Sequence, residues 1–160
     1  MSRAPEIQIN QKDSDGDIAV IYAIDKGHTE CMMILASVGN VNWNLKNKLG
    51  QTPLSRLLLC NRPECAQYIV GIPGVDLTVK DNERNTLAHY AVKVGNIDCV
   101  QILVGLDGIQ WNDKNDIGEI PVLVALAEND FDVVKLLVMV TNIDTNIRDM
   151  IRNSFEDICR

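Results

Sequence analysis

Aromatic residues, histidine and positive charge are all scarce in this chain of 160 residues. Phe, Tyr and Trp together make up 4% of it, so a buried core has to be built mainly from aliphatic side chains. The formal net charge is −7 and the Lys and Arg residues are scattered, which argues against nucleic acid as a partner. No apolar run approaches the roughly 18 residues that a membrane-spanning helix needs, and no secretory leader is visible. We therefore expect no membrane partner, and a location in the cytoplasm or the nucleus.

The cysteines lack the spacing of a disulfide framework or a zinc site. Their number, five, is odd, and no C-x-x-C motif occurs. Cys31, Cys65 and Cys99 stand 34 residues apart, and Val133 occupies the next equivalent position. This pattern predicts half-buried packing residues in a reducing compartment.

Constellations typical of enzymes are also missing from the sequence. His28 and His89 belong to segments that should not meet, and no glycine-rich phosphate loop follows a strand pattern. The run Asp13-Ser14-Asp15-Gly16-Asp17 is similar to the start of a calcium loop, but its twelfth position is Ile24 instead of a bidentate Glu. We expect no enzymatic activity, no cofactor and no metal site.

What the chain does contain is a short pattern that recurs every 34 residues. Asp or Asn opens each copy, and Gly follows three residues later in three of the four. The copies are the segments 13–20, 47–54, 81–88 and 115–122. A fixed period of this size is typical of a stacked array, in which one unit cannot bury its apolar face alone.

The same period holds outside this pattern. Apolar columns with this spacing are Val41, Val75, Ile109 and Ile143, and also Ile34, Tyr68, Ile102 and Leu136. Trp43 and Trp111 share a further column, for which packing between units is the favoured role and ligand stacking the minor alternative. The period divides the chain into a tail of a preceding repeat at 1–12, repeats at 13–46, 47–80, 81–114 and 115–148, and the start of a truncated fifth repeat at 149–160.

Local signals place two short helices in each unit. In the second unit, Thr52 suits a helix cap and Pro53 the first helical position, which predicts a helix from Pro53 to Cys60. Pro63 suits the start of a second helix that ends at Val70. The stretch 75–85 then predicts an extended finger that leads into the next unit. In the finger before it, Gly50 should have φ above zero. Arg84 stands in the same column as Gly50, which predicts either backbone strain or a different turn at that residue.

These motifs resemble ankyrin repeats. Asn47-x-x-Gly50-x-Thr52-Pro53-Leu54 is similar to the family's opening motif, and Lys26-Gly27-His28-Thr29-Glu30 is similar to the loop before its second helix. The resemblance covers almost the whole chain. It implies an all-α solenoid of stacked helix-turn-helix units with projecting β-hairpin-like fingers, and His89 bracing the turns through hydrogen bonds.

The resemblance also implies how such an array acts. Fingertips and first helices form a concave face that binds another protein, whose identity the sequence does not give. Exposed Leu49, Leu59 and Ile117 would then form an apolar centre with an acidic rim. The predicted protein-binding residues are Lys48, Leu49, Gln51, Leu59, Asn82, Glu83, Asn85, Lys93, Asp116, Ile117, Glu119 and Glu128.

Two alternatives stay open at this stage. The units could serve as a scaffold or spacer for a domain outside this sequence, in which case no continuous contact patch is expected on the concave face. Because neither end has the polar character of a capping repeat, the chain is either a piece of a longer array or a small protein with worn terminal units. Exposed apolar ends predict weak self-association.

Overall fold

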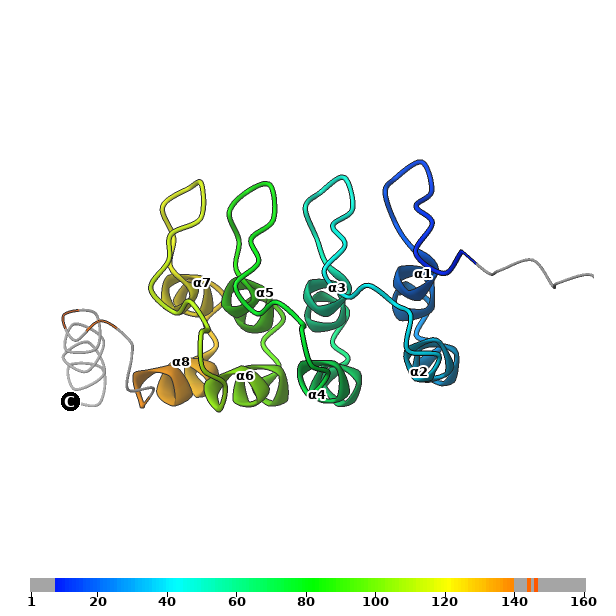
Figure 1. Ribbon diagram of the computed structural model, residues 1–160. Coiled ribbons are helices and arrows are strands. Elements are labelled where there is room, and N and C mark those ends of the chain that lie inside the picture. The colour runs from blue at the N-terminus through cyan, green and yellow to red at the C-terminus, as the bar shows by residue number, and fades with distance from the viewer. Residues whose placement is uncertain (1–7, 140–143, 145, 147–160) are drawn as a thin grey trace, which may run out of the picture.

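A computed structural model describes residues 8–139, 144 and 146, and the part it describes is a row of paired helices. Helices α1, α3, α5 and α7 lie side by side in one layer, and α2, α4, α6 and α8 in a second (Figure 1). Together they form the predicted all-α solenoid. Their bounds are α1 Ala19–Asp25, α2 Thr29–Ser37, α3 Pro53–Leu59, α4 Pro63–Val70, α5 Leu87–Lys93, α6 Ile97–Val104, α7 Pro121–Ala127 and α8 Phe131–Val138.

The helices of the first layer begin where the sequence predicts. Thr52 caps α3, because its side-chain oxygen accepts a hydrogen bond from the backbone N–H of Ser55, whose hydroxyl oxygen accepts one from the N–H of Thr52. In α5, His89 takes the place of that serine: its Nδ1 accepts a hydrogen bond of 3.1 Å from the N–H of Thr86. Helices of seven to nine residues are marginal alone, so stacking has to hold them.

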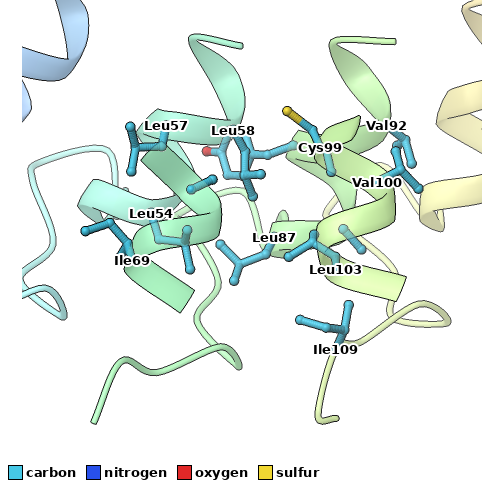
Figure 2. Close-up of a cluster of buried hydrophobic side chains, with 14 of the residues drawn as sticks. Leu54, Leu57, Leu58, Ile69, Leu87, Val92, Cys99, Val100, Leu103 and Ile109 are labelled. Atoms are coloured by element: carbon cyan, nitrogen blue, oxygen red, sulfur yellow. The ribbon is translucent and has the colours of Figure 1, made fainter. Parts of the chain in front are cut away.

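An aliphatic core fills the space between neighbouring units, as the low aromatic content predicts. Figure 2 shows Leu54 and Leu58 of α3 on the side of α5 and α6, whereas Leu57 points the other way, toward the first unit. These three leucines are at most 1% exposed, and each contributes about 1.5–3 kcal/mol by leaving water. Trp43 and Trp111 are buried too, so the packing role favoured for their column is confirmed.

The fingers are joined to one another by a repeated backbone hydrogen bond. The N–H of Lys48 donates to the carbonyl of Asp15 at 2.9 Å, and Asn82 donates to Leu49 at 3.0 Å. Asp116 donates to the carbonyl of the next fingertip residue, Glu83, at 2.9 Å. Within the described residues the only β-type pairing in a finger is an isolated bridge between Lys80 and Thr86. These backbone hydrogen bonds between neighbouring fingers form a ladder, which fixes the register of the fingers without making a sheet.

A left-handed residue sits in the turn of each finger. Gly50 has φ +80°, as predicted, and a Cβ there would lie 2.6 Å from the backbone nitrogen of Asn82. Arg84, in the equivalent position of the third finger, has φ +63°. It adopts the glycine conformation, which disfavours any residue with a Cβ, so the strained alternative holds.

One packing prediction was wrong. Cys31 is exposed, whereas its counterparts Cys65 and Cys99 are buried. Cys65 lies within 4.0 Å of Thr29 in the preceding unit, and Cys99 lies equally near Asn61 of its own preceding unit. The position is buried by the unit before it, and the described residues place no helix pair before α1 and α2.

Candidate functional site

We call the surface formed by the fingertips and by helices α1, α3, α5 and α7 the finger face. It corresponds to the predicted concave face (Figure 1). Its outermost row, the fingertip stripe, consists of one residue from each finger: Asp15, Leu49, Glu83 and Ile117. All four are exposed, Leu49 by 61% and Ile117 by 78%. Since the ladder occupies the carbonyl groups of the first three, the backbone is fixed while the side chains point to solvent.

The other predicted binding residues divide by exposure. Those that are exposed lie on the fingertips, on α5 or directly after α7, and they are Lys48, Asn82, Lys93, Asp116 and Glu128. Asn85 and Glu119 are half-buried at the finger bases. Leu59 was expected to be exposed, but it is half-buried and packs against the core, because α3 lies between α1 and α5. The apolar centre of the finger face is therefore carried by Leu49 and Ile117.

Gln51 does not belong on the contact surface. It is only 7% exposed, and its amide nitrogen donates a hydrogen bond of 3.1 Å to the hydroxyl of Tyr90. Its amide oxygen accepts one of 3.3 Å from Arg56, whose guanidinium also pairs with Asp25 at 2.5 Å. Gln51 thus holds neighbouring units together, and the prediction that it faces a partner was wrong.

Tyr90 is the residue that sequence reasoning missed here. Its hydroxyl donates a hydrogen bond of 2.6 Å to Asp81 while it accepts the one from Gln51. Burial, and then the bond to Asp81, raise the pKa of Tyr90 well above its usual value, so the hydroxyl stays protonated. Tyr22, two units earlier, donates to Asp13 in the same manner, and this repetition of a Tyr and an Asp two repeat periods apart was the available signal.

The finger bases are joined by a second set of side-chain contacts. Asn47 donates to the carboxylate of Asp17 at 2.9 Å, and Asn115 donates to the amide oxygen of Asn85 at 3.2 Å. Each of these bonds joins one unit to the preceding one. The floor of the finger face is therefore a rigid hydrogen-bonded layer beneath the exposed fingertip stripe.

A pocket of about 250 Å³ opens in this face between the third and fourth units. Its walls come from two fingers and from α5 and α7. Residues from all of these contribute to the lining: Glu83, Asn85, His89, Tyr90, Lys93, Asn115, Ile117, Glu119, Val124, Ala127 and Glu128. Six residues predicted from the sequence to bind a partner are thus brought together around one cavity.

The buried titratable groups of this region are structural. His89 is 2% exposed, its Nδ1 accepts from Thr86, and its Nε2 lies 3.0 Å from the carbonyl oxygen of Glu119. Burial lowers the pKa of His89, so the ring is neutral and Nε2–H donates to that carbonyl. His89 therefore braces two fingers, as the family resemblance implies.

Two further titratable groups, the thiol of Cys99 and the carboxylate of Asp13, are also held by burial or by local hydrogen bonds. Burial raises the pKa of Cys99 to about 11, which disfavours the nucleophilic thiolate. Asp13 is occupied within its own turn by the N–H groups of Asp15 and Asp17 and by the hydroxyl of Tyr22. Across residues 8–139, 144 and 146, no group of three metal-ligating side chains occurs, and no helix is long and apolar enough to cross a membrane.

A comparison with protein-family models finds ankyrin repeats, described as three copies, at residues 4–81 and 58–149. The chain belongs to the ankyrin repeat family. No curated protein matches it with significance. Ankyrin repeats generally act as protein–protein interaction modules and are typically non-catalytic.

Proposed function

We propose that this ankyrin array is a non-catalytic binding module that holds a partner protein against its finger face. The observation that carries the proposal is the exposure of Leu49 and Ile117 on either side of Glu83 in the fingertip stripe. Two large apolar side chains held in water on a fixed backbone are typical of a contact surface, where apolar anchors are ringed by polar groups.

The polar surroundings of these anchors support the same proposal. Lys48, Asn82 and Asp116 lie beside them on the fingertips and are exposed. Glu128 and Lys93 lie deeper, on the first-layer helices around the pocket. The finger face therefore has apolar anchors, a polar rim and a concavity. A spacer segment has no need of this combination.

We also propose that the module works in a reducing compartment, the cytoplasm or the nucleus. Cys31, Cys60, Cys65 and Cys99 are all free thiols in the structure. Cys31 is exposed and would be prone to oxidation or disulfide exchange in a secreted protein.

The test is capture of a partner by a variant with charged fingertips. Leu49→Glu together with Ile117→Glu should abolish capture, because each carboxylate would be desolvated in an apolar contact without a cation. Since both side chains are exposed, the helical circular dichroism should not change. The readout is quantitative mass spectrometry of proteins retained from a cell lysate.

The matched control introduces two glutamates on the second helical layer instead of the fingertips. Ile34 of α2 and Val38, the residue that follows α2, are 63% and 57% exposed, so Ile34→Glu together with Val38→Glu adds the same two charges at similar exposure. A protein retained by the parent chain and by this control, but not by the fingertip variant, is the expected result. Equal retention by all three chains, or loss only in the control, would overturn the proposal.

A further inference from the structure

We infer that the pocket between the third and fourth units receives a long basic side chain, arginine above all, from the partner protein. This inference rests on the proposed function, since it names what the partner inserts into the finger face. It follows from the way the pocket arises in the sequence, from the charges around it, and from an arginine of this chain that occupies the equivalent place in another unit.

The pocket exists because two positions of the repeat carry small side chains in the fourth unit only. Val124 stands where the first three units have Tyr22, Arg56 and Tyr90. In those units the long side chain reaches over the finger base and makes polar contacts there. Val124 is too short to do so, and the base of the fourth finger is left uncovered.

The second small residue enlarges the same opening. Ala127 stands where the earlier units have Asp25, Leu59 and Lys93. Both Val124 and Ala127 line the pocket, with Ile117 at the fingertip above them. These three side chains form one apolar wall of an otherwise mostly polar pocket, along which the methylene groups of a long side chain can pack.

Arg56 shows what the chain itself places at this position. Its guanidinium lies between the carboxylate of Asp25, at 2.5 Å, and the amide oxygen of Gln51, at 3.3 Å. In the fourth unit the residue equivalent to Gln51 is Glu119. The residue equivalent to Asp25 is Lys93, so the ion pair of the second unit is not reproduced there, but Glu119 offers a carboxylate where Arg56 meets only an amide oxygen.

The charges around the pocket favour a cation. Glu83, Glu119 and Glu128 line it, and none of them takes part in the three ion pairs found among the described residues. Lys93 is the one basic residue of the lining. A neutral or aromatic side chain would fill the volume but would desolvate these carboxylates without pairing them, which costs free energy. A guanidinium can instead donate N–H hydrogen bonds to these carboxylates in planar, bidentate geometry.

The test uses a small probe that carries only the proposed group. N-acetyl-arginine methylamide is titrated into the intact chain, and the methyl signals of Val124, Ala127 and Ile117 are followed by NMR. We expect saturating shifts with a dissociation constant on the order of 1 mM, as fits a ligand of this size. N-acetyl-citrulline methylamide has nearly the same shape without the charge, and it should bind at least tenfold more weakly.

Two variants separate pocket filling from charge. Val124→Tyr should abolish the shifts, because it restores the side chain that covers the finger base in the third unit. Glu119→Gln keeps the volume and removes one carboxylate, so it should weaken binding severalfold while the circular dichroism stays unchanged. Shifts that do not saturate, equal binding of citrulline, equal or stronger binding of N-acetyl-phenylalanine methylamide, or unchanged binding by both variants would each overturn the inference.

The outcomes also distinguish this inference from the proposal beneath it. If arginine does not bind but partner capture still requires Leu49 and Ile117, then the inference of an inserted basic side chain is wrong. The finger face then remains the proposed binding surface. If capture is indifferent to the fingertip variant, the proposed function fails, whatever the titration shows.

Discussion

The side-chain amide of Gln51 donates a hydrogen bond of 3.1 Å to the hydroxyl oxygen of Tyr90, across 39 positions of the sequence. Tyr90 in turn donates to Asp81 at 2.6 Å, so one hydroxyl joins the second finger to the base of the third. Both Gln51 and Tyr90 are buried. A polar contact between units is thus sealed inside the array, as is the contact between His89 and the carbonyl of Glu119.

Removing that hydroxyl should destabilise the array. Tyr90→Phe leaves the buried amide of Gln51 without its acceptor, which costs about 1–3 kcal/mol of the free energy of unfolding. Urea unfolding followed by circular dichroism measures the change. Tyr22→Phe is the matched control: Tyr22 occupies the same column but is 53% exposed, so its loss should have a much smaller effect. Equal losses in the two variants would contradict the role assigned to the Gln51–Tyr90 contact.

The close approach of the fingers can be measured at glycine. Gly50 and Gly74 have nearly equal φ values, +80° and +86°, but of these two only Gly50 would bring a Cβ against a neighbouring finger. Gly74→Ala should cost about 1 kcal/mol for the left-handed backbone alone. Gly50→Ala should cost clearly more, because its Cβ would lie 2.6 Å from the backbone nitrogen of Asn82. If the slope of unfolding against urea is the same, the difference between the urea midpoints of the two variants measures the cost of the contact between fingers. Equal midpoints would mean that the neighbouring finger moves aside at little cost.

The strain at Arg84 predicts a stabilising substitution. Arg84→Gly should raise the free energy of unfolding by about 0.5–1 kcal/mol, since glycine adopts φ +63° without steric cost but loses more entropy on folding. Thermal melting should show a higher midpoint. Glu83→Gly, at the neighbouring residue without positive φ, serves as the control and should not stabilise. A drop in stability for Arg84→Gly would show that the arginine side chain makes a compensating contact.

His89 should make stability depend on pH below neutrality. Its pKa is lowered in the folded chain by burial, so the unfolded chain binds a proton first as the pH falls below about 6.5. Stability is therefore complete above that pH and is lost as the pH falls through the lowered pKa of His89. Protonation would place a second N–H against the N–H of Thr86, where Nδ1 now accepts.

Chemical unfolding between pH 7.5 and 5 measures this effect. His89→Gln keeps an acceptor for the N–H of Thr86 but cannot be charged, so its free energy of unfolding should stay nearly constant over that range. If the parent chain shows the same flat profile, proton binding by the unfolded chain at His89 does not limit stability.

Much of the fold could be predicted because the period of 34 residues repeats the same physical requirement. The start of α3 at Pro53 follows from its cap and its imino acid, and the burial of Trp111 follows from its column. The left-handed turn at Gly50 was predicted for the same reason. Such features depend on local geometry or on a position that every unit shares.

The features that were missed depend on how particular units differ. Burial of Gln51 requires the hydroxyl of Tyr90, which only the third unit places there. Cys31 is exposed because the described residues place no helix pair before α1 and α2, which its column does not reveal. The pocket arises from the small side chains of Val124 and Ala127. Aligning the units by what their equivalent positions share does not reveal where one unit differs from the others.

The most direct measurement of the central claim is site-specific photo-cross-linking to a captured partner. Benzoylphenylalanine replaces Ile117 on the fingertip stripe in one chain and Ile34 on α2 in another, two apolar positions that are 78% and 63% exposed. Irradiation of the complex should give a covalent adduct with the partner from position 117 and none from position 34. An adduct from position 34 alone would place the partner on the second helical layer and contradict the finger face as the binding surface.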